Sequence, residues 1–203
     1  LEKSPKGHTP GNPVQLVDSD EKFLAAGYGN PNSLIAFRAL SFERSETEFY
    51  SIDFVVKKVL KAWKQRAALG FHHSFRLCYG EGDFLPGAVI DRYLADDSHG
   101  NKVQVFAIQI LTYGMNNILT DISLFFQILN EAALQNMLCD VSWDQTAIVV
   151  RNDVSIRKLE GLEVIKPFLA REAPGVNLRN IPIWIDQEFK MSCDLLEGQK
   201  TGF

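Results

Sequence analysis

The sequence predicts an α+β protein, in which a small strand-rich N-terminal region precedes a larger region of antiparallel strands and two helices. Two observations carry this prediction. Short apolar runs separated by Gly, Pro and Asn clusters fill the start of the chain, a pattern typical of a small β-barrel or sandwich. Two later segments repeat apolar residues at three- and four-residue steps, as amphipathic helices do.

The strands are expected where apolar residues alternate with polar ones or form short runs between turn residues. In the N-terminal region they are expected at 14–17, 23–26 and 34–40. Further along, strands are expected at 76–79, 88–93, 102–110, 139–143, 147–151, 181–186 and 189–195, and the last two are expected to pair as a hairpin.

The segment 51–69 is the clearest expected helix. Ser51 is a suitable N-cap, Asp53 falls in the first turn, and Gly70 is a suitable stop signal. A second helix is expected over 117–134. The two apolar faces are expected to consist of Ile52, Val55, Val56, Val59, Leu60 and Trp63 in the first helix and of Ile118, Ile122, Phe125, Phe126, Leu129 and Ala133 in the second.

Positive charge gathers on the opposite face of the first helix, although the formal net charge of the chain is −4. From Lys57 to Arg76 there are six Lys or Arg and no acidic residue. A nucleic-acid backbone would favour such a face through counterion release. A solvated helix face without a partner would show the same run, because exposed lysines are common. Both interpretations stay open at this point.

Composition is typical of a globular protein of one or two domains, with 203 residues and 46% hydrophobic content. Cys78, Cys139 and Cys193 are scattered and odd in number, which favours reduced thiols and a cytoplasmic location. No apolar run approaches the length of a membrane span. The chain starts at Leu1, so we expect residues to precede it and leave targeting open.

Two further patterns resemble functional sites, a phosphate loop and a pair of histidines, but the details of each argue against such a site. Lys200 and Thr201 lie between glycines as in a phosphate loop, but Gln199 stands where that motif needs glycine. His72 and His73 are adjacent and cannot share one helix face. The Cys and His spacings do not match a metal site, so we expect no metal ligands.

The acidic residues Glu81, Asp83 and Asp91 could in principle form an acid–base pair or a metal site. Such chemistry needs carboxylates that converge in a cleft. We instead expect these acids to cap turns and to pair with Arg92.

Four stretches, read in chain order, resemble the RlmI-like S-adenosylmethionine-dependent ribosomal RNA methyltransferases. One is Gly-Glu-Gly-Asp-x-Leu-Pro-Gly-x-x-x-Asp-Arg-Tyr over 80–93, which resembles the signature of the family's central domain. The segments 10–18 and 23–38 resemble its N-terminal PUA domain. Two others, 151–162 and Leu-Leu-Glu-Gly-Gln-Lys-Thr-Gly-Phe over 195–203, resemble segments at and before the entry to its catalytic domain.

The resemblance implies a small PUA-like β-barrel, which is an RNA-binding fold, followed by a mixed α+β central domain. The family's opening strand is absent, so the barrel is expected to be partial. The expected division is 1–45 for the PUA-like domain, 46–70 for a connecting basic helix, 71–196 for the central domain, and 197–203 for the lead-in to a methyltransferase domain. Arg157 and Lys158 match a basic segment of the family and are candidate RNA contacts, with salt bridges to Glu160 or Glu163 as the alternative.

The family is taken to methylate carbon 5 of cytosine in large-subunit ribosomal RNA, with S-adenosylmethionine as cofactor. Cys193 does not match its cysteine nucleophile, so the resemblance implies no catalytic residue in this chain and a Rossmann-like catalytic domain that is absent from it. The residues expected to border the cofactor site are Lys200, Thr201, Gly202 and Phe203. We expect no tight binding of the cofactor by the chain itself.

The sequence thus predicts the RNA-recognition portion of a ribosomal RNA methyltransferase, with ribosomal RNA as partner, no membrane association and a homodimer as a further expectation. The alternatives are a stand-alone RNA-binding protein and a protein-interaction module. The candidate RNA-binding residues are Lys57, Lys58, Lys61, Lys64, Arg66, Arg76, Arg157 and Lys158.

Overall fold

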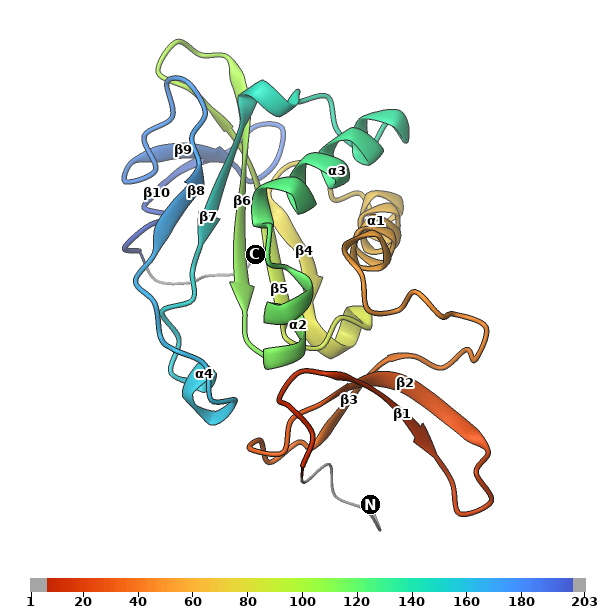
Figure 1. Ribbon diagram of the computed structural model, residues 1–203. Helices are drawn as coiled ribbons and strands as arrows, with labels where there is room; N and C mark the ends of the chain where they lie inside the picture. Colours follow the sequence, from red (N-terminus) through yellow and green to blue (C-terminus); the bar gives the residue numbers. More distant parts are fainter. Residues whose placement is uncertain (1–6, 199–203) are drawn as a thin grey trace.

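A three-stranded antiparallel sheet forms the N-terminal part of the protein, whose computed structural model describes residues 7–198. Its strands are β1 (Pro13–Val17), β2 (Phe23–Gly29) and β3 (Phe37–Ser41), with β2 in the middle. Asp18 begins the turn between the first two strands, where its side chain accepts from two backbone N–H groups. This sheet lies below one end of a larger sheet (Figure 1).

The larger sheet has seven strands in the order β10-β9-β5-β6-β7-β8, and β4 also pairs with β5. Neighbouring strands run antiparallel, except that β6 and β7 are parallel and are joined through helices. The strands are β4 (Phe75–Tyr79), β5 (Ala88–Asp96), β6 (Lys102–Ile110), β7 (Thr146–Val150), β8 (Phe168–Arg171), β9 (Ile181–Trp184) and β10 (Lys190–Cys193).

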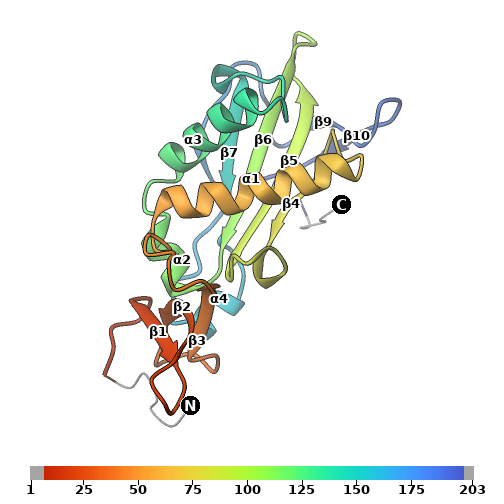
Figure 2. The same cartoon turned by 90° about the vertical axis from the view of Figure 1, so that its right-hand side faces the viewer.

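Two long helices, α1 (Ile52–Ala68) and α3 (Ile122–Gln135), lie across one face of this sheet (Figure 2). Each begins at a residue whose side chain accepts a backbone hydrogen bond, Ser51 from Phe54 and Asp121 from Leu124. The shorter helical segments are α2 (Tyr113–Ile118), α4 (Ile156–Leu159), η1 (Gly80–Asp83) and η2 (Trp143–Gln145).

The main core lies between these helices and the sheet. Phe106 of β6 stacks on Phe126 of α3 with ring centroids 4.7 Å apart, and its edge meets Trp63 of α1 at 6.0 Å. A second core lies on the other face, where residues of β6 and β7 pack with residues of β9 and with Leu195. The sheet must curl to bring these strands together, because β9 and β7 are not neighbours in it.

The small sheet is attached to the large one by a buried tyrosine. The hydroxyl of Tyr28 in β2 donates to the carbonyl oxygen of Pro86 at 2.5 Å and lies 2.7 Å from Oγ1 of Thr112. A Cβ added to Gly114 in α2 would lie 2.1 Å from the Tyr28 ring. Glycine at this position therefore allows α2 to lie directly against the small sheet.

The fold-class prediction was wrong in its architecture. In place of the expected partial barrel, the N-terminal strands form an open three-stranded sheet, since so few strands cannot close on themselves. The larger region is not a purely antiparallel sheet with two helices, because β6 and β7 are parallel and α2 and α4 are additional helices.

Several local predictions also need correction, while others are confirmed. The helix expected over 117–134 is divided into α2 and α3, because Asp121 starts a new helix. The strand expected at 139–143 is not formed, and β8 was missed. The first helix, its Ser51 cap and the β9–β10 hairpin are confirmed.

Candidate nucleic-acid interface

The basic face predicted on the first helix is exposed. Lys57, Lys61 and Lys64 lie one and two turns apart along α1 and point away from the buried stripe that contains Val59 and Trp63. Within residues 7–198 none of these three lysines forms an ion pair or a hydrogen bond. Their positive charge is therefore available to a partner.

Lys58 lies beside this stripe and reaches an aromatic pair. Its Nζ is 4.9 Å from the ring centroid of Phe54 and 5.8 Å from that of Phe84. Phe84 in turn meets Phe42 edge to face at 6.4 Å, and the two residues are 52% and 62% exposed. Exposed phenylalanines beside a cation are the groups on which unpaired bases stack.

Phe84 has a φ of 57°, in the left-handed region that side chains other than glycine adopt at a cost. This backbone conformation places the ring at the rim of a cavity of about 310 Å³ between β3 and η1. The residues that line it are Ile35, Phe37, Arg38, Ala39, Phe42, Glu81, Phe84 and Pro86. The cavity lies between the small sheet and the η1 segment that follows β4.

Two of the predicted RNA contacts are held in ion pairs. Arg66 donates to both carboxylate oxygens of Asp83, at 2.9 and 2.7 Å, and Arg76 pairs with Asp91 at 2.8 Å. Asp91 was expected to pair with Arg92, but successive residues of a strand point to opposite faces, and β4 presents Arg76 to Asp91 instead. Their charges are therefore compensated, unlike those of the three lysines.

The other two predicted contacts, Arg157 and Lys158, lie in α4. Arg157 is buried and donates to the carbonyl oxygens of Ile110 and Glu163. Burial lowers the pKa of this guanidinium, and the nearby Glu163 opposes that effect in part. Lys158 is exposed. The eight predicted residues therefore do not form one patch, and the available charge lies mainly on α1.

A carboxylate that the sequence did not single out joins α4 to the small sheet. Glu160, which is 3% exposed, accepts from Nδ2 of Asn30, Oγ of Ser33 and Nη2 of Arg38. Burial alone would raise the pKa of Glu160, but these three hydrogen bonds together hold it below its ordinary value. The partners are separated by 122 to 130 residues, so no local pattern could have indicated the contact.

Nucleotide-cofactor sites of Rossmann-like sheets lie at the carboxyl ends of parallel strands. Here the parallel strands β6 and β7 end at Ile110 and Val150. At that edge Asn152 accepts from the backbone N–H of Ile110 at 2.8 Å, and Arg157 donates to the Ile110 carbonyl, so both side chains are used by the fold itself. The predicted cofactor residues 200–203 lie outside the described residues.

The three cysteines are not activated as nucleophiles. Burial raises the pKa of Cys78 to about 12 and also raises the pKa of Cys139 and Cys193. A thiol that stays protonated is a weak nucleophile. Residues 7–198 include no helix that is both long and apolar enough to cross a membrane.

Comparison with known proteins finds a PUA-like domain at the N-terminus and similarity to ribosomal RNA methyltransferases along most of the chain. The family model of a PUA-like domain matches residues 1–42. Ribosomal RNA large subunit methyltransferase I of Pseudoalteromonas translucida is 32% identical over 195 residues, and that of Klebsiella pneumoniae is 33% identical over 197 residues. Each alignment covers 95% of this chain and 42% of the relative, so the chain spans about two fifths of the length of these curated relatives.

Two solved structures share the fold. One is a protein of Streptococcus mutans assigned as a SAM-dependent methyltransferase, with a TM-score of 0.58, and the other is a methyltransferase complexed with SAH, with a TM-score of 0.59. Both are 15% identical to this chain, cover 94% of it, and are themselves covered to 42% and 41%. At this identity the likeness establishes the fold alone.

These matches overturn the expectation that a Rossmann-like catalytic domain is absent from the chain, because methyltransferase structures align with 94% of it. The curled sheet also contains a parallel pair, β6 and β7, connected through α2 and α3. A parallel pair connected by helices is the unit from which Rossmann-like sheets are built. Over 95% of its length, the chain is similar to the ribosomal RNA large subunit methyltransferase I proteins.

Proposed function

We propose that this chain acts in the S-adenosylmethionine-dependent methylation of large-subunit ribosomal RNA and that its described part grips the RNA. The lysine face of α1 carries this proposal, because Lys57, Lys61 and Lys64 are exposed and uncompensated in a chain of net charge −4. The names of the homologues and the PUA-like match at the N-terminus support ribosomal RNA as the substrate.

In this proposal the three lysines hold the phosphate backbone, while Phe42 and Phe84 offer their faces to unpaired bases. The target is proposed to be carbon 5 of a cytosine, which must leave its stack to be methylated. The proposed division of labour is an RNA-binding PUA-like domain over 1–45, a basic connecting helix over 46–70, a central domain over 71–196 and a lead-in over 197–203.

S-adenosylmethionine is the proposed methyl donor of the whole protein, supported by the methyltransferase homologues and by the neighbour complexed with SAH. The proposed contribution of the described residues is to bind and orient RNA. Methyl transfer is tested with the full-length protein, by following labelled methyl groups into large-subunit ribosomal RNA and identifying the methylated nucleoside by mass spectrometry.

RNA binding is tested with a fluorescent fragment of large-subunit ribosomal RNA, titrated with the chain over a series of salt concentrations. Replacing Lys57, Lys61 and Lys64 by glutamate should abolish binding. Arginine at the same positions keeps the charges and should bind as the unaltered chain does. Replacing the three by alanine should lower the slope of log K against log[salt] by about 2, since each phosphate contact on a single strand contributes about 0.7.

The alternative occupant of this surface is another protein. Association through apolar surface depends weakly on salt, whereas RNA binding through lysines weakens steeply as salt is added. A chain that binds no ribosomal RNA at low salt, or binds it equally well with three glutamates on α1, would contradict the proposed function.

A further inference from the structure

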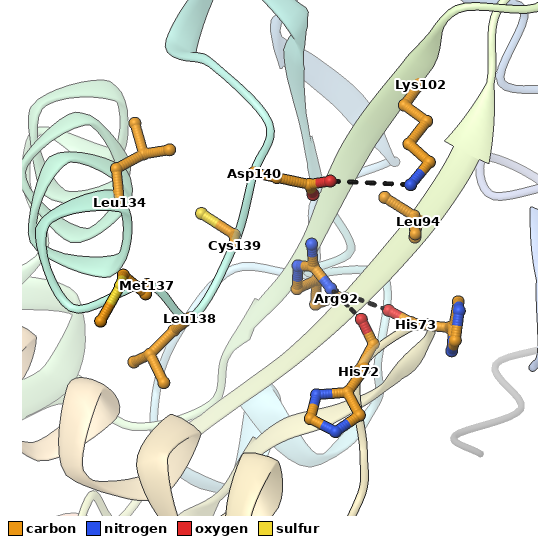
Figure 3. Close-up of a pocket in the computed structure, with 10 residues that line it drawn as sticks. All are labelled: His72, His73, Arg92, Leu94, Lys102, Leu134, Met137, Leu138, Cys139 and Asp140. Atoms are coloured by element: carbon orange, nitrogen blue, oxygen red, sulfur yellow. Dashed lines mark hydrogen bonds and ion pairs between the residues drawn. The ribbon is translucent and has the colours of Figure 1, made fainter.

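A second basic site lies at the other end of α1, in a cavity of about 460 Å³ that the sequence did not suggest (Figure 3). It is formed where the chain leaves α1, where α3 ends, and over the adjoining strands β5 and β6. The residues that line it are His72, His73, Arg92, Leu94, Lys102, Leu134, Met137, Leu138, Cys139 and Asp140.

Arg92 lies at the floor of this cavity and is 1% exposed. Its guanidinium carbon lies 5.2 Å from the ring centroid of Trp63 and 5.9 Å from that of Phe75. A cation enclosed in this way needs compensation, because removing an ion from water costs several kcal/mol or more. The charge of Arg92 therefore needs a compensating group at this site.

The partners of Arg92 are all neutral. Its Nη1 donates to the backbone carbonyls of His72 and His73 at 3.0 and 2.9 Å, and its Nε donates to Oε1 of Gln104 at 3.1 Å. In the described part of the chain no carboxylate forms an ion pair with Arg92, and its Nη2 has no hydrogen-bond partner. Burial lowers the pKa of Arg92 to about 10, as expected for an uncompensated buried cation.

Lys102 adds a positive charge at the rim of the cavity. Lys102 stands at the rim, where Nζ lies 3.6 Å from Asp140, and both side chains are largely exposed. His72 and His73 lie beside Arg92, whose guanidinium contacts the backbone carbonyls of both residues (Figure 3). Burial lowers the pKa of His73, and interactions with His72, Lys102 and Arg92 lower it further, while Asp186 opposes them. The single acid at the rim, Asp140, is already paired with Lys102.

The remaining wall is apolar and belongs to the end of α3. Leu134, Met137 and Leu138 form it, and Met137 is 92% exposed and has a φ of 55°. A cavity with a cationic floor and an apolar wall offers complementary surfaces to the phosphate and to the sugar and base of one nucleotide. Its volume is also within the range usual for sites that hold small molecules.

We propose that this cavity binds a phosphate group of an RNA strand, with Arg92 at its floor and Lys102, His72 and His73 at its rim. The inference rests on the proposed function, because it takes the strand to be the RNA that the lysine face of α1 holds. Arg92 suits the role since its Nη2, which has no hydrogen-bond partner among the described residues, can donate a charge-assisted hydrogen bond to a phosphate oxygen. A free phosphate ion shares this chemistry, and the experiment separates the two sources.

The first arm measures binding of inorganic phosphate to the full chain by NMR. The ring resonances of His72 and His73 should shift as phosphate is added at constant pH and ionic strength, and equivalent chloride should not shift them. Lys102→Ala should reduce the shift at each phosphate concentration. Lys166→Ala removes another exposed lysine that does not line the cavity and should leave the shift unchanged.

The second arm measures RNA binding over a salt series. Lys102→Ala should lower the slope of log K against log[salt] by about 0.7, the contribution of one phosphate on a single strand. Arg92→Lys should weaken binding further, because one ammonium cannot replace the planar guanidinium. Arg92 also packs in the core, so its variant is interpreted only if its circular dichroism and unfolding midpoint match those of the unaltered chain.

The outcomes distinguish the two proposals. RNA binding that is intact in the unaltered chain and unaffected by Lys102→Ala would overturn the phosphate site but leave the proposed function standing. A shift of both histidines with inorganic phosphate, without any RNA binding, would overturn the proposed function and the assignment of the phosphate to RNA. Histidine shifts together with the reduced salt slope support the site.

Discussion

Nη2 of Arg38 donates to Oε1 of Glu160 across 2.8 Å, and this buried ion pair joins β3 to the residue that ends α4. The two side chains are 15% and 4% exposed. The other end of the Arg38 guanidinium, Nη1, reaches Glu81 at 2.6 Å, but the side chain of Glu81 is 67% exposed. One arginine thus has a buried and an exposed carboxylate partner, which offers an internal comparison.

Replacing Glu160 by glutamine should lower the free energy of unfolding by about 3 kcal/mol, because it leaves Arg38 without its buried counter-charge. The matched change Glu81→Gln should lower the free energy of unfolding by less than about 1 kcal/mol, because exposed ion pairs usually contribute little to stability. Both values come from urea unfolding followed by tryptophan fluorescence. Equal losses in the two variants would show that the buried pair does not anchor the small sheet.

The same carboxylate should make stability depend on pH. The pKa of Glu160 is held below its ordinary value of 4.5, so the unfolded chain takes up this proton at a higher pH than the folded chain. Its contribution is therefore complete above pH 4.5 and is lost as the pH falls through the folded pKa. The difference in unfolding free energy between the unaltered chain and Glu160→Gln should narrow when urea titrations are moved from neutral pH to below 4.5. A constant difference would contradict this assignment.

Gly114→Ala should destabilise the protein even though alanine favours helices. The added Cβ would lie 2.1 Å from the Tyr28 ring, so either α2 or the ring must move, at a cost of about 1–3 kcal/mol. Gly82→Ala is the control, since that glycine has open space around it and no left-handed φ. Gly82→Ala should change the free energy of unfolding by no more than about 0.5 kcal/mol. Thermal unfolding of the two variants side by side makes the comparison.

Phe84→Asn should separate RNA binding from stability. Asparagine tolerates the left-handed conformation at this position better than phenylalanine, which offsets the lost packing of a half-exposed ring. The free energy of unfolding should change by less than about 1 kcal/mol. RNA affinity should fall about tenfold, since stacking of one base is worth about 1–3 kcal/mol. Unchanged RNA affinity in a folded variant would remove Phe84 from the proposed interface.

Local signals account for what the sequence predicted correctly. Helix α1 combines a side-chain cap at Ser51, an apolar stripe and a glycine just after its end, and all three lie within one short segment. The β9–β10 hairpin likewise joins neighbouring strands. The parallel pairing of β6 with β7 depends instead on how α2 and α3 pack, and the sequence pattern of β6 is equally compatible with antiparallel neighbours.

The candidate site likewise combines features that follow from local sequence signals with contacts that depend on long-range packing. The exposure of Lys57, Lys61 and Lys64 follows from helical periodicity, so it was predictable. The pairing of Arg76 with Asp91 depends on the register of β4 against β5, which a single sequence does not fix. The cavity around Arg92 brings together residues from the ends of α1 and α3, which are far apart along the chain. No sequence motif indicates this cavity.

The attachment of the small sheet has a consequence for selectivity. Glu160 and Tyr28 tie that sheet to the large one through buried contacts at two separate points, so the two sheets are held at a fixed angle. In the proposed function, an RNA that touches both must present its backbone along a path that matches this angle. The protein would then choose among RNAs by their three-dimensional shape before any base is read, as proteins that recognise folded RNA commonly do.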